Sequence, residues 1–127
     1  IMFDLNNLKI INDSKGHSKG DQLILNFARL LRNVIPKEDF VGRYGGDEFM
    51  VVIYNTSKTE IEDILKQLSM EKDRLNRSGN QMPIDYACGW AISDADSECT
   101  IQMLLDKADY YMYENKQSRK KSKQSLK

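Results

Sequence analysis

The sequence predicts an α+β fold in which an antiparallel-rich sheet carries helices on one side. Short apolar runs with a period of two indicate strands, and longer runs with apolar residues three and four apart indicate helices. These runs follow one another in the order βααββαβα, without repeats or an internal linker. Two consecutive strand-like runs are joined by a glycine-containing turn, which predicts a hairpin and hence antiparallel pairing.

The first third of the chain predicts one strand and two helices. Residues 1–5 form a short apolar run with an acidic residue near its end, as expected of a buried strand. Residues 6–13 predict a short helix, and the break at Gly16 closes it. From Lys19 onward the apolar residues fall on one helical face, and Pro36 ends that second helix.

The remaining elements follow the same logic. Residues 40–44 and 48–54 predict the two strands of the hairpin, and Ser57 begins a helix with capping-box spacing. Residues 84–92 alternate large with mostly small side chains, which predicts a long strand whose large residues face the helices. Thr100 is the expected N-cap of the last helix. We expect the small residues on the other face of the long strand to let another element pack closely.

Composition narrows the class of protein. Hydrophobic residues make up 40% and charged residues 30% of the 127 residues, which is typical of a globular domain. Lysine plus arginine and aspartate plus glutamate number 19 each, so the zero net charge gives no support for a nucleic-acid polymer or an anionic membrane as partner. The sequence contains no apolar run of bilayer length. Cys88 and Cys99 lack metal-ligand spacing, which favours reduced thiols in a cytoplasmic protein.

The hairpin turn carries the most informative stretch, Gly45-Gly46-Asp47-Glu48. Two glycines allow positive φ angles and let a ligand approach without a Cβ in the way. Two adjacent carboxylates then follow on opposite sides of the strand. Acidic glycine turns are common on protein surfaces, so this motif alone leaves a non-catalytic interpretation open.

A second acidic residue strengthens the catalytic interpretation. Asp4 lies at the end of the first strand, and if that strand neighbours the hairpin, Asp4 and Asp47 can share one hard cation. Mg²⁺ takes one or two protein carboxylates and leaves its other positions to water and phosphate oxygens. The carbonyl of Leu5 can supply a further oxygen. Taken alone, Asp4 would be interpreted as a strand-ending acid that caps the next helix.

A polar loop supplies groups suited to a nucleobase. The amide of Asn12 both donates and accepts, and the carboxylate of Asp21 only accepts, which matches the donors and acceptors of guanine. Taken alone, the loop is equally typical of Asx turns and a helix cap. The sequence has no glycine-rich P-loop with its lysine, which excludes that kind of nucleotide site.

Together these stretches resemble the GGDEF domain, the diguanylate cyclase module of bacteria. The resemblance rests on residues 3–13, Gly16-His17, Gly20-Asp21, Gly45-Gly46-Asp47-Glu48-Phe49 and the closing helix around Lys116. It implies a fold close to that of class III nucleotide cyclases and the polymerase palm, with a ferredoxin-like sheet. It also implies a catalytic domain over residues 1–116 and a basic, flexible tail over residues 117–127.

The resemblance implies a role for each matching residue. Asp4 and Asp47 would bind metal with the Leu5 carbonyl, and Glu48 would lie near the ribose 3′-hydroxyl as a base or second metal ligand. The remaining roles concern the nucleotide: Asn12 and Asp21 for guanine, Lys9, Lys116 and Lys120 for the triphosphate, and Gly45 and Gly46 for close approach. Arg119 is the alternative to Lys120 as a phosphate contact.

The implied reaction joins two GTP molecules into cyclic di-GMP and two pyrophosphates, with Mg²⁺, or alternatively Mn²⁺, as cofactor. A second copy of the domain would bring the other GTP, and an upstream sensor domain would regulate the enzyme. The alternative is a degenerate module that binds GTP or cyclic di-GMP without turnover. The family's inhibitory R-x-x-D site keeps only Asp39 here, which predicts weak or absent product inhibition by this route.

Overall fold

The computed structural model describes residues 1–94 and 98–125, with side chains up to Lys121. Its elements follow the predicted order. The strands are β1 (Met2–Leu5), β2 (Phe40–Arg43), β3 (Glu48–Val52) and β4 (Tyr86–Gly89). The helices are α1 (Leu8–Lys15), α2 (His17–Val34), α3 (Lys58–Ser78) and α4 (Ile101–Ser125). The α+β fold class is therefore confirmed.

The four strands form one sheet in the order β2-β3-β1-β4, and every neighbouring pair is antiparallel. Strand β1 lies between β3 and β4, so all four of its residues are buried. The register sets Asp4 opposite Glu48 on β3 and Leu5 opposite Tyr86 on β4. The end of β1 is thus held from both sides.

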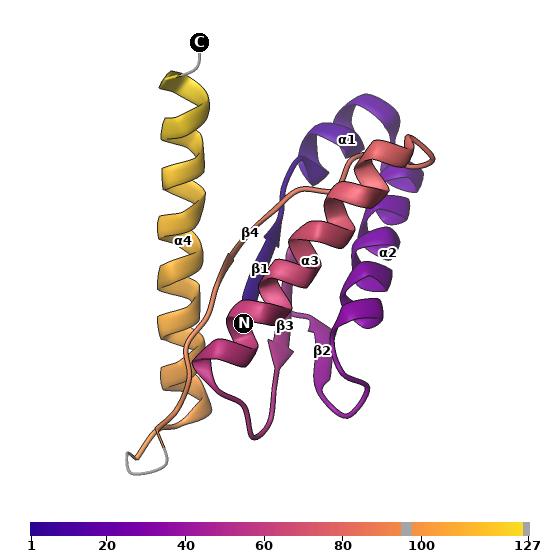
Figure 1. The fold of residues 1–127 in the computed structure, drawn as a ribbon. Coiled ribbons are helices and arrows are strands. Elements are labelled where there is room, and N and C mark those ends of the chain that lie inside the picture. Colours follow the sequence, from indigo (N-terminus) through magenta and orange to yellow (C-terminus); the bar gives the residue numbers. More distant parts are fainter. Residues whose placement is uncertain (95–97, 126–127) are drawn as a thin grey trace.

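Helices α2 and α3 cover one face of the sheet (Figure 1). Aromatic and aliphatic side chains fill the space between the helices and the sheet. Phe27 of α2 lies at the centre of this core. Its ring centroid is 5.8 Å from that of Phe3, 4.9 Å from that of Phe49 and 5.4 Å from that of Tyr86. The pairs with Phe3 and Phe49 are edge-to-face and the pair with Tyr86 is tilted, and edge-to-face pairs add stabilisation beyond the burial of their area.

Helix α4 packs on the opposite face, so the expectation that all helices lie on one side is wrong (Figure 1). Here Met2 and Ala87 of the sheet contact Ala108 and Met112 of the helix. A Cβ at Gly89 would lie 2.1 Å from the backbone nitrogen of Met112, so α4 approaches this closely only because position 89 is glycine. The small residues of the alternating segment therefore do admit a closely packed element, as predicted.

Two element lengths differ from the sequence prediction. Strand β4 ends at Gly89, opposite Met2, whereas we expected a strand through residue 92; Ile92 is exposed. Helix α4 runs without interruption to Ser125, through most of the expected flexible tail. Residues 126–127 of that tail lie outside the described residues. The lysines, glutamines and arginine of this segment favour helix, and Arg119 bonds to the sheet, which explains the continuation.

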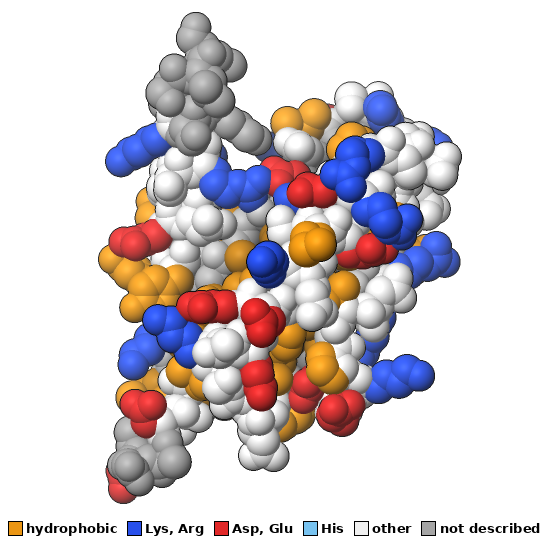
Figure 2. All heavy atoms as spheres, in the orientation of Figure 1, with side chains coloured by type: hydrophobic (Ala, Val, Ile, Leu, Met, Phe, Trp, Pro, Cys, Tyr) orange, Lys and Arg blue, Asp and Glu red, His pale blue; other side chains and the backbone are white. Residues whose placement is uncertain are grey.

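The two predicted helix caps, Ser57 and Thr100, are confirmed, whereas α1 begins at Leu8 and α2 at His17 instead of at residues 6 and 19. The Ser57 hydroxyl accepts a hydrogen bond from the Glu60 amide at 3.2 Å, and the Thr100 hydroxyl accepts one from the Met103 amide at 3.1 Å. Side-chain caps satisfy amides that have no partner inside the helix. On the face shown in Figure 2, acidic and basic side chains are intermixed. Over the described part of the chain, every helix is too short or too polar to cross a bilayer.

Candidate functional site

The end of β1 and the β2–β3 turn meet directly. The Leu5 amide donates a 2.7 Å hydrogen bond to the Asp47 carbonyl, and Asp4 lies opposite Glu48 in the register. Three acidic residues from two distant parts of the sequence therefore gather where β1 ends.

The turn is closed by its own backbone and by one arginine. The amides of Tyr44 and Gly45 both donate to the Glu48 carbonyl, at 2.8 and 3.2 Å. The Arg43 guanidinium donates to the carbonyls of Gly45 and Gly46, the shortest of these bonds being 2.7 Å. Arg43 has no predicted role, although a cation two residues before the Gly45-Gly46 pair is the signal that could have indicated one.

The two glycines of the turn do not have the conformation we expected. Positive φ angles occur at Gly16 and Gly79 but at neither Gly45 nor Gly46. A Cβ at Gly46 would meet nothing within 4 Å, and one at Gly45 would meet Glu48 at 3.8 Å. The protein itself therefore leaves open space beside both glycines, which is the condition for close approach of a ligand.

Asp4 has one satisfied and one unsatisfied carboxylate oxygen. Its side chain is only 10% exposed, and Oδ2 accepts a 2.8 Å hydrogen bond from the Lys116 ammonium of α4. Oδ1 is buried and lacks a hydrogen-bond partner among the described residues. A buried anionic oxygen without a partner is costly, so this position suits a bound cation.

The electrostatics of the cluster favour a cation. Burial and the neighbouring Asp4 carboxylate raise the pKa of Asp47. Burial, then Asp109 and Asp4, raise the pKa of Glu48. The hydrogen bond to Asp4 raises the pKa of Lys116, which alone among these groups offsets the negative charge. Asp109 of α4 is a further acid that sequence analysis missed, because its proximity depends on how α4 packs.

The residues present fit a hard divalent ion. Within the part of the chain that the structure describes, no group of three or more acidic, histidine or cysteine side chains is arranged to hold a metal. Mg²⁺ needs fewer, because water and phosphate oxygens complete its shell. Asp4 Oδ1, the Asp47 carboxylate and the Leu5 carbonyl are the oxygens that would hold it.

A cavity of about 280 Å³ adjoins these acids. It is lined by the turn into α1, by Asp47 and by basic residues from two helices: Lys9, Lys116, Arg119 and Lys120. Lysines next to a paired carboxylate site suit a ligand that carries both phosphate and a metal ion.

The residues predicted to contact guanine lie on two contacting helices. Asn12 is on α1 and Asp21 is on α2. A Cβ at Gly20 would lie 1.7 Å from Asn12 Oδ1, so the glycine lets the Asn12 amide lie against α2. Asn12 Oδ1 is buried without a hydrogen-bond partner among the described residues, and Asp21 is exposed. The Asn12 oxygen is thus unpaired but enclosed, whereas the Asp21 carboxylate is open to a ligand.

Asp39 serves the fold. It is 7% exposed, and its carboxylate accepts a 3.1 Å hydrogen bond from the Tyr54 amide just beyond β3. The acid retained from the expected inhibitory motif is therefore engaged by the backbone.

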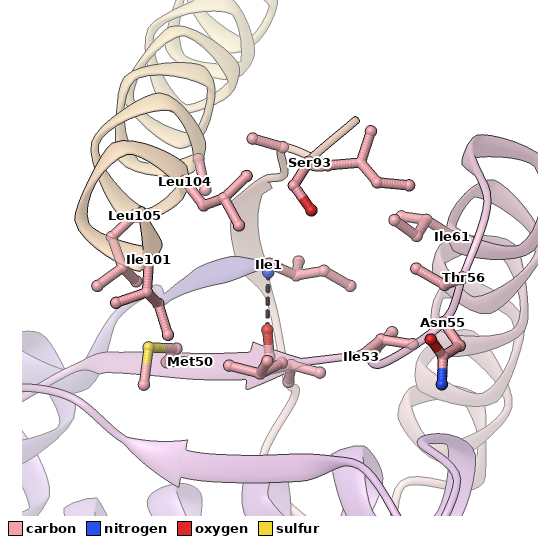
Figure 3. Close-up of a pocket in the computed structure, with 15 residues that line it drawn as sticks. Ile1, Met50, Ile53, Asn55, Thr56, Ile61, Ser93, Ile101, Leu104 and Leu105 are labelled. Carbon is pink, nitrogen blue, oxygen red and sulfur yellow. Dashed lines mark hydrogen bonds between the residues drawn. The ribbon is translucent and has the colours of Figure 1, made fainter. Parts of the chain in front are cut away.

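A second, apolar hollow lies away from the acids, between the first half of α4, the end of β3 and the start of α3 (Figure 3). It measures about 370 Å³, and Ile1 lies in it with its backbone nitrogen bonded to the Val51 carbonyl at 2.8 Å. Its lining consists mainly of aliphatic side chains, so it offers no catalytic groups.

Comparisons with known proteins agree with the geometry. A family model described as "Diguanylate cyclase, GGDEF domain" matches residues 1–122. "Signaling protein YkoW" of Bacillus subtilis (strain 168) is 36% identical over 123 residues, which are 94% of this chain and 15% of that protein. "Diguanylate cyclase A" of Treponema denticola is 28% identical over 120 residues, which are 93% of this chain and 32% of that protein. The chain thus spans only a minor part of either relative.

Solved structures show the same fold. The active GGEEF domain of a diguanylate cyclase from Vibrio cholerae superposes with a TM-score of 0.76 at 28% identity, covering 92% of this chain and 74% of that one. The GGDEF domain of DgcB from Caulobacter crescentus, in complex with c-di-GMP, gives a TM-score of 0.79 at 25% identity, covering 92% and 70%.

Proposed function

The chain belongs to the GGDEF family of diguanylate cyclase domains, and from that membership we propose that it condenses two GTP molecules into cyclic di-GMP. One observation carries the proposal beyond the family match. Asp4 and Asp47 converge beside a cavity lined by lysines, and one buried oxygen of Asp4 has no partner among the described residues. That arrangement suits a nucleoside triphosphate with its divalent ion.

We assign the metal-binding oxygens to Asp4, Asp47 and the Leu5 carbonyl. When Mg²⁺ or Mn²⁺ is bound there, it neutralises phosphate charge and lowers the pKa of the attacking hydroxyl. Lys116 now holds Asp4 at 2.8 Å and can turn to the triphosphate once Asp4 binds the ion. Lys9 and Lys120 line the same cavity and would contact the outer phosphates.

We assign guanine recognition to Asn12 and Asp21. The Asn12 side-chain amide would offer guanine a donor and an acceptor, and the exposed Asp21 carboxylate would accept from N1–H or N2–H. A site built to accept hydrogen bonds rejects a base that lacks the donors, since its buried polar atoms would stay unpaired. GTP is therefore the expected substrate, in preference to ATP.

Each half-reaction forms one bond and breaks one. The 3′-oxygen of one GTP attacks the α-phosphorus of the other, the bond from that phosphorus to the bridging oxygen breaks, and pyrophosphate leaves. The proton of the 3′-hydroxyl passes to a base, for which Glu48 is the candidate because its raised pKa favours accepting a proton. Two such steps close the ring, so two copies of the domain must face each other, each with one GTP.

We infer that other domains of the protein regulate this domain. The curated relatives are several times longer than the matched segment, which supports further domains, such as a sensor, in the protein to which this domain belongs. We place the reaction in the cytoplasm, where GTP is available. Because Asp39 is engaged by Tyr54 and the partnering arginine is absent, we expect weak product inhibition. Tight binding of cyclic di-GMP that Asp39→Ala abolishes would contradict this.

The test of the proposed function is product formation. The chain is incubated with GTP and Mg²⁺, its dimerisation is measured by light scattering, and cyclic di-GMP is detected by mass spectrometry. We expect product from the wild type and from Asp63→Ala, an exposed acid on α3, and none from Asp47→Ala. If the dimer binds GTP but forms no product, the protein is a nucleotide-binding module and the cyclase proposal is wrong.

A further inference from the structure

Asp85, directly before β4, joins two segments that line the cavity of about 280 Å³ beside the acids, namely the turn after β1 and the last part of α4. The Asn6 side-chain amide donates to Asp85 Oδ2 at 3.0 Å, and the Asn6 backbone amide donates to the Asp85 carbonyl at 2.9 Å. On the other side, the Arg119 guanidinium of α4 donates to Asp85 Oδ1 and to the Tyr86 carbonyl. The turn after β1, the start of β4 and the end of α4 are therefore tied together at one carboxylate.

The arrangement is partly buried and electrostatically matched. The side chains of Arg119 and Asp85 are 32% and 24% exposed. Burial opposes ionisation of Asp85, yet the hydrogen bonds from Arg119 and Asn6 outweigh it and lower the pKa of this carboxyl below its ordinary value. A charge-assisted contact in such surroundings is stronger than an exposed ion pair.

The contact lies beside the lysines assigned to the substrate. Arg119 follows Lys116 by three residues on α4 and precedes Lys120, and all three line the same cavity. Lys116 is bonded to Asp4, whereas Lys120 is exposed. Helix α4 thus reaches the end of β1 by two bonds, one to a metal-site acid and one to Asp85.

We propose that Asp85 and Arg119 are positioning residues that hold α4 and its lysines beside the β1–α1 turn while the nucleotide is bound. When Lys116 turns to the triphosphate, its bond to Asp4 Oδ2 is given up, and the Asp85–Arg119 contact remains, together with the bond from the Cys88 amide to Asn115, to hold this part of α4 on the sheet. It follows that Arg119 acts through Asp85 and that Lys120 makes the phosphate contact. This inference rests on the proposed function.

The competing interpretation makes Arg119 itself the phosphate contact. In that case Asp85 would restrain a cation that the substrate needs, and its removal would leave affinity unchanged or improve it. A lysine at position 119 would keep the charge, and hence the phosphate contact. If Arg119 positions α4, nucleotide affinity depends on the planar guanidinium group, which donates to both Asp85 and the Tyr86 carbonyl. A lysine ammonium cannot make both hydrogen bonds in this geometry.

The test measures the affinity of α,β-methylene-GTP with Mg²⁺ by calorimetry, since the bridging carbon blocks pyrophosphate release. We expect Asp85→Asn, Arg119→Gln and Arg119→Lys each to weaken binding by roughly tenfold, as loss of an outer-shell partner does. The Asp85→Asn/Arg119→Gln double variant should be no weaker than either single variant. Lys121→Gln, which removes one exposed charge from the same helix, is the matched control and should bind like the wild type.

Hydrogen exchange of the amides of residues 113–121 separates positioning from general stability. In Asp85→Asn we expect near wild-type protection without ligand, because Lys116 still holds Asp4, and faster exchange than in the wild type once Mg²⁺ and nucleotide are bound. Faster exchange by the same factor in both states would show a merely structural contact and overturn the proposal.

Two further results would overturn it. One is wild-type affinity in Asp85→Asn or in Arg119→Lys, and the other is a double variant whose loss equals the product of the single losses. In each of these cases the wild type binds the nucleotide, so the proposed function stands. If the wild-type chain binds no guanine nucleotide, both the proposed function and this inference are wrong.

Discussion

The two faces of the sheet differ in the side chains that pack against them. Toward α2 and α3, four aromatic rings and many aliphatic side chains form a core centred on Phe27. Toward α4, small residues bring helix and sheet together, and beyond them the interface ends in Asp4, Lys116, Asp85 and Arg119. The comparison indicates that one face supplies most of the stability and the other places the chemistry.

The largest effect on stability is expected at the centre of the aromatic face. Phe27→Ala removes the ring that contacts three others and should lower the free energy of unfolding by about 3–5 kcal/mol. Chemical denaturation measures this loss. Leu25→Ala, at a 44% exposed position on the same helix, is the control and should change stability by less than about 0.5 kcal/mol. Equal losses in the two variants would contradict the assignment of the core.

Gly89 tests how closely α4 packs on the sheet. Gly89→Ala places a Cβ 2.1 Å from the Met112 nitrogen and 2.4 Å from the Ala108 carbonyl oxygen, so α4 must move. We expect a loss of about 1–3 kcal/mol in unfolding free energy, together with weaker nucleotide binding, because Lys116 moves with the helix. Denaturation and calorimetry on one sample give both quantities.

Gly46→Ala should behave in the opposite way. Its Cβ would meet no protein atom within 4 Å, so stability should stay within about 0.5 kcal/mol of wild type. Cyclic di-GMP synthesis should nevertheless fall, since the methyl group occupies space proposed for the nucleotide. If this variant makes cyclic di-GMP at the wild-type rate, Gly46 does not lie in the nucleotide site.

A smaller effect concerns pH and the metal-free protein. Because the pKa of Asp47 is raised in the folded state, the fold binds this proton more tightly than the unfolded chain does, and stability is lost as pH rises through that raised pKa. Asp47→Asn removes the repulsion from Asp4. At neutral pH without divalent ions, the variant should therefore melt slightly above the wild type, and the difference should disappear in acid. Thermal melts across pH check the sign, and a lower melting temperature for the variant at neutral pH would contradict it.

Much of the fold and of the acidic site could be predicted from the sequence. The strand that ends at Asp4 and the hairpin at Asp47 are local patterns, and an antiparallel sheet brings such neighbours together. The side of the sheet on which α4 lies could not be predicted, because alternation shows which residues share a face but does not show which element covers each face.

The roles of Arg119 and Asp85 also lie beyond local pattern. In the sequence, Arg119 stands in a basic run that is equally typical of a solvated helix end. Its partner Asp85 is 34 positions away, and the pairing exists only once α4 lies against β4. The absence of positive φ angles at Gly45 and Gly46 likewise could not be predicted, because the hydrogen bonds from Arg43 and the β-ladder that shape this turn are not visible in composition.

The most direct test of the account is whether Asp4 and Asp47 bind one ion together. Titration of Mn²⁺ followed by electron paramagnetic resonance, with GTP present and Mg²⁺ as competitor, reports the number and affinity of sites. We predict a site in the wild type that Mg²⁺ displaces, and loss of that site in both Asp4→Asn and Asp47→Asn. Retention of the site at wild-type affinity in either variant would contradict the shared metal site.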